Sequence, residues 1–162
     1  MLPPLPEAVR LLPSAAAFAR RTKAELESVS ALSSVKVPRS LAASSLAEAL
    51  SRSRKLKLPF VVKGNLHGAT VVHTQEAIAP AVADHAARWG YPVVLQEYIP
   101  GTEFDVVALA DEAWQLVGVV PMKKLQLDDR GKAWGALTVD DPGLIRAAQR
   151  VAGGLCWSGP LE

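Results

Sequence analysis

The sequence predicts an α+β fold in which two small lobes are built from mainly antiparallel strands flanked by helices. Three segments rich in apolar and β-branched residues, at about 92–98, 104–110 and 114–120, predict consecutive strands. Asp111 and Glu112 lie between the last two segments and predict a turn. Helical patterns precede and follow this strand–turn–strand core, which favours two lobes with a cleft between them.

The segment before this core is predicted to contain three helices and two short strands. Ser14 is expected to cap the first helix, and a capping box at Ser45 begins the second. Pro59 ends the second helix because proline disfavours helical geometry in the residue before it. Pro80 should bend the third helix or delay its start, and Gly90 marks its end. The expected helices cover 14–34, 45 to about 57, and 75–89; the expected strands cover 60–63 and 70–74.

The segment after the core is predicted to begin with an irregular, basic stretch at 121–134. Asp140-Asp141-Pro142 is a strong helix start, with an acid at the cap and proline in the first turn. Gly153 and Gly154 are expected to weaken the end of this helix. The last residues, 159–162, fall where another strand can begin.

Composition argues against several classes of protein. The 162 residues suit one domain or two small lobes, and a net charge of +2 gives no argument for nucleic-acid binding. The tryptophans are too dispersed to form a nucleic-acid surface. One cysteine, Cys156, excludes a disulfide framework, and the histidines form no metal-ligand motif. No apolar run approaches ~20 residues and no signal peptide is recognisable, so a cytoplasmic protein without membrane contact is expected.

A lysine ends the expected apolar strand 60–63. The stem of Lys63 can pack on the strand while its ammonium meets phosphate oxygens. Taken alone, Lys63 is better explained as an edge-strand lysine in solvent. The small-residue loop 64–69, which contains Gly68, changes this balance because backbone N–H groups can approach a phosphate there. The loop is not a P-loop, since no Gly-Lys-Ser/Thr follows.

The segment Gln96-Glu97-Tyr98-Ile99 is a polar hinge after an apolar strand. Such a hinge can bind adenine through its backbone, here with the Glu97 carbonyl as acceptor and the Ile99 N–H as donor. The Gln96 side chain can add a further contact. Glu103, which follows a Pro-Gly turn, can accept hydrogen bonds from both ribose hydroxyls. The alternative is a plain hairpin corner with solvent-exposed acids.

The order of Lys23, Lys63, the small-residue loop, the hinge 96–99 and Glu103 resembles the ATP-grasp superfamily. Within it, the chain most resembles the branch related to the large subunit of carbamoyl-phosphate synthase. The resemblance covers about residues 5–162 and includes the segments 130–135 and 155–162. It implies an ATP-grasp-like fold with a nucleotide cleft between the two lobes.

The resemblance also implies roles for individual residues. Lys23 and Lys63 would contact the α- and β-phosphates, and the loop would close over them. Residues 96–99 would hold adenine between apolar walls that include Val61 and Ile99, while Glu103 would hold the ribose. Four basic residues are candidates for the γ-phosphate or the acyl substrate, with a solvated basic loop as an equal alternative: Lys123, Lys124, Arg130 and Lys132.

By the same resemblance, residues 1–34 are a lead-in and helix from a missing first domain. Residues 35–95 form the small nucleotide-binding lobe, and residues 96–162 form an incomplete second lobe. The family's metal-binding acid and its Glu-x-Asn element would follow Glu162. The cofactors implied are therefore ATP and Mg²⁺, with no metal ligand expected in this chain and no catalytic residue assigned.

The implied activity is that of an ATP-dependent carboxylate–amine (or thiol) ligase. ATP phosphorylates a small-molecule carboxylate to an acylphosphate, which a nucleophile then captures. Without metal ligands the chain is expected to be weakly active or inactive. The alternative is a non-catalytic nucleotide-binding or interaction module derived from the same fold. Apolar surface left exposed by missing segments would promote self-association.

Overall fold

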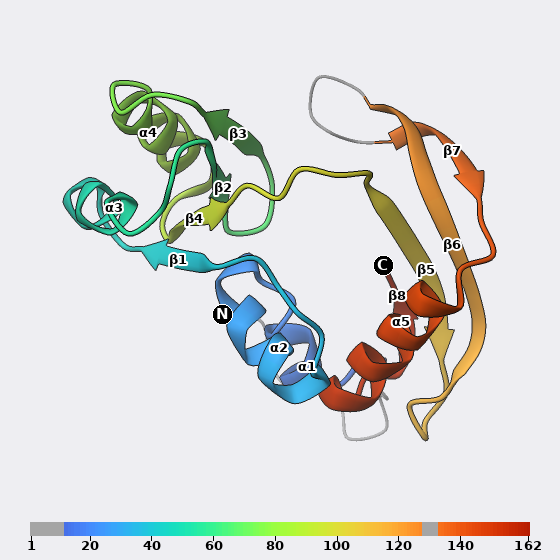
Figure 1. The fold of residues 1–162 in the computed structure, drawn as a ribbon. Helices are drawn as coiled ribbons and strands as arrows, with labels where there is room; N and C mark the ends of the chain where they lie inside the picture. The colour runs from blue at the N-terminus through green and yellow to red at the C-terminus, as the bar shows by residue number, and fades with distance from the viewer. Residues whose placement is uncertain (1–11, 128–132) are drawn as a thin grey trace.

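The computed structural model describes residues 12–127 and 133–162. Within them the strands form two four-stranded sheets, with the orders β1-β4-β2-β3 and β7-β6-β5-β8 (Figure 1). Neighbouring strands in both sheets are antiparallel. The predicted α+β fold is therefore confirmed. Below, sheet A denotes β1-β4-β2-β3 and sheet B denotes β7-β6-β5-β8.

Helices cover one face of sheet A, and Lys63 lies on the opposite face. Phe60 and Val62 of β2 are fully buried in the core beneath the helices, whereas Val61 and Lys63 alternate onto the opposite face. This period of two explains why the strand reads as apolar and still ends in a lysine. The elements of this half are β1 (Ser40–Ala43), α3 (Leu46–Ser53), β2 (Phe60–Gly64), β3 (Ala69–Val72), α4 (Ile78–Trp89) and β4 (Val93–Glu97).

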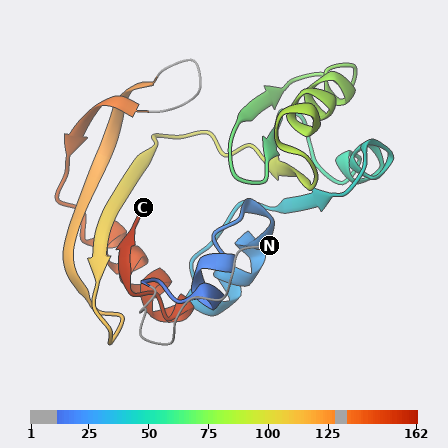
Figure 2. The same ribbon diagram turned by 180° about the vertical axis from the view of Figure 1, so that it is seen from behind.

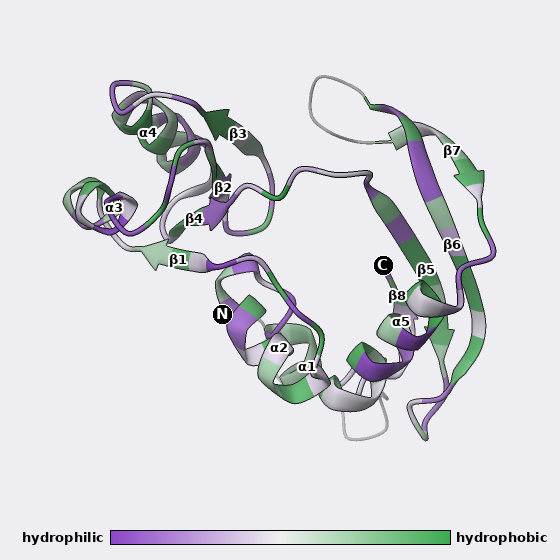
Figure 3. Ribbon diagram, viewed as in Figure 1, coloured by the Kyte–Doolittle hydropathy of each residue, from purple (hydrophilic) through white to green (hydrophobic). Residues whose placement is uncertain are grey.

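Sheet B is covered on one face by α5, which contacts both β5 and β6. Ala108 and Ala110 are buried on the covered face, while Val107 and Leu109 alternate onto a face that leaves them more than 40% exposed. Figure 3 shows apolar residues along much of sheet B, interrupted by hydrophilic stretches on β5 and β6. The elements are β5 (Phe104–Ala110), β6 (Leu116–Leu127), β7 (Ala133–Thr138), α5 (Pro142–Leu155) and β8 (Gly159–Leu161).

The N-terminal segment and α5 join the two halves at the end away from the hinge. Helix α2 packs against α5, and segment 98–103 connects the sheets on the other side (Figure 2). The segment contains α1 (Ala15–Ala19), the 3-10 turn η1 (Lys23–Glu25) and α2 (Leu26–Ser33). Within the described residues, no helix combines the length and apolar character needed to cross a membrane.

The local capping signals are confirmed. The Ser14 side chain accepts a hydrogen bond from the Ala17 N–H at 3.2 Å, and the Ser45 side chain accepts one from Glu48 at 3.2 Å. Asp141 caps α5 by accepting bonds from the next two N–H groups after Pro142, at 2.7 and 3.2 Å. Helix α4 starts at Ile78, so Pro80 falls in its first turn and the predicted delay is also confirmed.

Two predictions about elements are wrong, and one strand was not predicted. The single helix expected over 14–34 is broken between α1 and η1, because the Lys23 N–H bonds to the Asn65 carbonyl at 3.1 Å instead of continuing a helix. The strand β1 was not expected; its short sequence gives little signal and it is defined by pairing with β4. Residues 121–134 are not irregular where they are described, since β6 continues to Leu127 and pairs with β7.

Candidate functional site

Lys23 and Lys63 lie close together although they are far apart in sequence. Lys23 is carried by η1, which packs against β1, and Lys63 projects from β2. Burial lowers the pKa of Lys23 below its ordinary value, and the positive charge of Lys63 lowers it further. Two ammonium groups that repel each other in a half-buried position are stabilised by an anion between them.

The Lys63 ammonium makes no hydrogen bond or ion pair with any other described residue. Burial lowers the pKa of Lys63, and the negative charge of Glu103 opposes this shift in part. Glu103 comes from the start of sheet B, so the two predicted site residues of different lobes lie within electrostatic range. The structure therefore gathers Lys23, Lys63 and Glu103 in one region, here called the lysine site.

The loop between β2 and β3, residues 65–68, is held from the side of Lys23. The Lys23 ammonium donates to the Leu66 carbonyl at 2.5 Å and to the Gly64 carbonyl at 3.5 Å. The Ala24 N–H donates to the Asn65 side chain at 3.3 Å. Lys23 thus links the N-terminal segment to the loop that was predicted to close over phosphates.

The same loop rests on α4. Gly68 has a left-handed backbone, with a φ of +79°, and a Cβ built there would lie 2.9 Å from the His85 ring and 3.2 Å from Trp89 Nε1. Trp89 also contacts the His67 ring at a centroid distance of 5.3 Å. Gly68 is therefore required for packing on α4; its role at a phosphate stays a prediction. Sequence reasoning gave His85 and Trp89 no role at the site, because their contacts with the loop are tertiary.

The hinge residues occupy both faces of β4. Gln96 lies opposite Val61 and is buried, with its amide donating to the Ser40 hydroxyl at 2.9 Å. Glu97 lies opposite Phe60 and is exposed; its carboxylate accepts the Arg39 N–H at 3.2 Å. These partners show that both side chains have structural roles in sheet A. Their contacts with adenine stay predictions.

Ile99 lies beyond β4 and is 60% exposed. Its N–H belongs to the segment that connects the two sheets, where the adenine donor was predicted. An exposed apolar side chain in this segment has contact surface to offer a ligand. The wall role of Ile99 and Val61 also stays a prediction.

Glu103 forms an ion pair in this structure. The Lys124 ammonium lies 3.4 Å from the Glu103 carboxylate and 3.1 Å from that of Asp105. Burial acts to lower the pKa of Lys124, but the bonds and charges of Asp105 and Glu103 outweigh it and raise that pKa. Lys124 is thus a firmly charged group beside the predicted ribose acceptor. Lys123 alternates to the opposite face of β6.

Two of the four basic candidates, Arg130 and Lys132, lie outside the described residues. Among residues 12–127 and 133–162, no three His, Cys, Asp or Glu side chains gather in a way that could hold a metal ion. Lys124 pairs with both Glu103 and Asp105, and its single positive charge offsets one of the two carboxylate charges.

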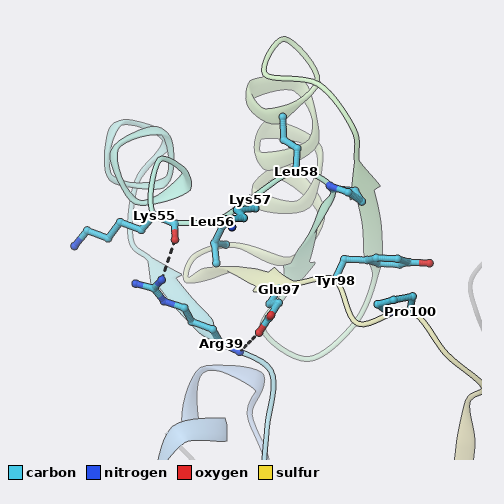
Figure 4. A pocket seen from close by; sticks show the side chains of 9 residues that line it. Arg39, Lys55, Leu56, Lys57, Leu58, Glu97, Tyr98 and Pro100 are labelled. Atoms are coloured by element: carbon cyan, nitrogen blue, oxygen red, sulfur yellow. Dashed lines mark hydrogen bonds between the residues drawn. The ribbon is translucent and has the colours of Figure 1, made fainter.

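A cavity of about 610 Å³ lies next to the hinge but does not contain the lysine site. Its lining includes Arg39, Leu56, Tyr98 and the Glu97 side chain (Figure 4). Because Glu97 pairs with Phe60, its side chain lies on the face of sheet A opposite Lys63. The Arg39 guanidinium is bound to the Lys55 carbonyl at 2.9 Å, and the Lys55 ammonium points away from the cavity (Figure 4). The charge arrangement at Lys23 and Lys63 locates the candidate phosphate site better than this cavity does.

Comparisons with known proteins bear on the fold. No protein-family model matches the chain, and no curated protein matches it. Among solved structures, a biotin carboxylase from Campylobacter jejuni has a TM-score of 0.72 at 16% identity, over 92% of this chain and 38% of its own. A D-alanine–D-alanine ligase from Bacillus anthracis has a TM-score of 0.68 at 16% identity, over 92% of this chain and 53% of its own.

The ATP-grasp ligase PsnB, solved with a minimal precursor, Mg and ADP, has a TM-score of 0.61 at 17% identity. The match covers 91% of this chain and 46% of PsnB, so the chain spans about half the length of such structures or less. Identities this low establish the fold alone. With its two antiparallel sheets joined by a hinge, the chain has the ATP-grasp fold.

Proposed function

We propose that the chain binds ATP at the lysine site as part of an ATP-grasp ligase that activates a carboxylate through an acylphosphate. The observation that carries this proposal is the pair Lys23 and Lys63, two partly desolvated ammonium groups brought together near Glu103. Solved proteins with the same fold include complexes with ATP and with ADP. The order of site residues along the chain supports the carbamoyl-phosphate synthase-like branch.

Each part of the site has a defined task in this proposal. The lysines neutralise the negative charge of the α- and β-phosphates. The β2–β3 loop closes over these phosphates, and the hinge 96–99 holds adenine. Glu103 exchanges its contact with Lys124 for the ribose hydroxyls. Lys124 keeps its pairing with Asp105 and presents its remaining N–H donors to the γ-phosphate or the acyl substrate.

In this proposal Mg²⁺ would bind together with the nucleotide. When bound, it would neutralise charge that develops on the phosphates during transfer. The described residues offer no cluster of acids that would hold it alone. The remaining expectations, a small-molecule carboxylate as substrate and self-association through exposed apolar strands, belong to this proposal as well.

A second candidate function is nucleotide binding without catalysis. It is favoured by one observation, the pairing of both nearby carboxylates, Glu103 and Asp105, with Lys124. Such a module would bind ATP with little dependence on Mg²⁺ and would not turn it over. The two functions are separated by measuring ATP hydrolysis in the presence of a panel of amino acids and other small carboxylates. Turnover that depends on a carboxylate favours the ligase, and binding without turnover favours the non-catalytic module.

Calorimetric titration of ATP, with and without Mg²⁺, tests the shared part of both functions. Lys63→Ala should weaken ATP binding by roughly ten- to hundredfold, because a charge-assisted contact to phosphate is lost. Lys36→Ala removes an exposed lysine to which no site role is assigned, and this variant should bind ATP like wild type. Equal ATP binding by wild type and Lys63→Ala would contradict the phosphate role of Lys63.

A further inference from the structure

His85 is a buried histidine that the proposed chemistry does not use. It lies in α4, is 4% exposed, and its Nε2 atom is 3.1 Å from the Thr70 hydroxyl of β3. Its other ring nitrogen, Nδ1, is buried and has no hydrogen-bond partner among the described residues. Buried polar atoms of this kind call for a physical explanation, because leaving one unpaired costs free energy.

The unpaired edge of the imidazole faces the β2–β3 loop. A Cβ added at Gly68 would lie 2.9 Å from His85 Cε1 and 3.1 Å from Nδ1, so the Gly68 backbone passes directly over that edge. Trp89, one helical turn later, lies beneath Gly64 and Gly68 in the same manner. His85 and Trp89 therefore form a platform that fixes both ends of the loop.

We infer that His85 is a positioning residue for the β2–β3 loop, holding it on α4 in the conformation that meets the phosphates of ATP. The inference rests on the proposed function for its ligand. Lys23 holds the loop from the other side through the Leu66 carbonyl. The loop is thus fixed between η1 and α4. Because it is already ordered in the free protein, ATP binding does not include the entropic cost of ordering it.

This arrangement works only with a neutral imidazole. A protonated His85 would have two N–H donors, and the Nδ1 donor would face Gly68 with no acceptor. Burial lowers the pKa of His85 below 6.5; Asp84 opposes this shift, while Arg88 and Lys23 add to it. Because the unfolded chain protonates first, the contribution of neutral His85 to stability is complete above pH 6.5 and is lost as the pH falls below it.

The test compares three variants of the full chain. His85→Leu removes the bond to Thr70, His85→Gln keeps an amide that can bond to Thr70 but cannot be protonated, and His73→Leu is a control at an exposed histidine. Hydrogen exchange of residues 64–70 is measured without nucleotide. ATP affinity is measured by calorimetry at pH 8 and at pH 5.5.

We expect His85→Leu to raise exchange mainly at 64–70 and to weaken ATP binding by roughly three- to tenfold, the effect of losing a hydrogen bond that holds the loop. His85→Gln should keep much of the wild-type protection of residues 64–70 and much of the wild-type ATP affinity. Acidification should loosen the loop in wild type more than in His85→Gln. Unchanged loop exchange in His85→Leu, or loosening spread over the whole protein, would overturn the inference.

Two further outcomes separate this inference from the proposed function. If wild type does not bind ATP but His85 variants loosen the loop selectively, the proposed function fails and the positioning role stands. If wild type binds ATP and all three variants bind it equally, the positioning role fails. If His85→Leu does not fold, the change in loop hydrogen exchange between pH 8 and pH 5.5 is compared in wild type and His85→Gln. The same change in both proteins would overturn the inference.

Discussion

Phe60→Ala should lower the free energy of unfolding by about 3–5 kcal/mol, the cost of removing a fully buried aromatic ring and leaving a cavity. Phe60 has no exposed surface and belongs to the core beneath α3 and α4. Urea unfolding followed by tryptophan fluorescence measures the change. A loss below about 1 kcal/mol would show that this core can collapse around the missing ring.

The neighbouring residue supplies the control. Val61 lies on the opposite face of β2 and is only partly buried, so Val61→Ala should cost about 1 kcal/mol or less. In the proposed function Val61 is instead a wall of the adenine site. Val61→Ala should therefore weaken ATP binding with little loss of stability, whereas Phe60→Ala should do the reverse wherever the variant remains folded. Equal stability losses in the two variants would contradict the assignment of faces.

The fold could be predicted from sequence where the signals are local. The caps at Ser14, Ser45 and Asp141 each depend on one side chain and the N–H groups two or three residues later. The alternation around Lys63 depends on the period of a strand. The break before η1 could not be predicted in this way, because the Lys23 N–H bonds to Asn65, far along the chain.

In the candidate site, too, features that depend on local sequence could be predicted, and features that depend on tertiary contacts could not. Lys63 and Glu103 could be proposed from sequence because Lys63 ends an apolar strand and Glu103 follows the Pro-Gly turn after another, in a recognisable order. The platform of His85 and Trp89 depends on how α4 packs beneath the loop, and neither residue type nor spacing indicates this. The pairing of Glu103 with Lys124 likewise arises from the register of β5 and β6. The sequence therefore suggests candidate residues for the site, whereas the contacts that hold these residues in place are visible only in the structure.

Gly154→Ala should destabilise the protein by about 1–3 kcal/mol, because the close packing of α5 on α2 leaves no room for a methyl group. A Cβ at Gly154 would overlap the Leu32 carbonyl group, at 2.7 Å from its carbon, and would lie 2.9 Å from the Ser33 Cα. These are backbone atoms, which cannot rotate away as a side chain can. The two helices would have to separate.

The adjacent glycine makes the argument specific. A methyl group at Gly153 would meet no other atom within 4 Å, so Gly153→Ala should stabilise α5 by about 0.5–1 kcal/mol through helix propensity alone. From sequence, Gly153 and Gly154 were both expected to weaken the helix. That expectation rests on helix propensity alone and does not include the packing of α5 against α2. Thermal unfolding of the two variants should therefore shift in opposite directions. Because α2 follows η1 directly, separation of α2 from α5 should also displace Lys23, and ATP binding should weaken in Gly154→Ala but not in Gly153→Ala.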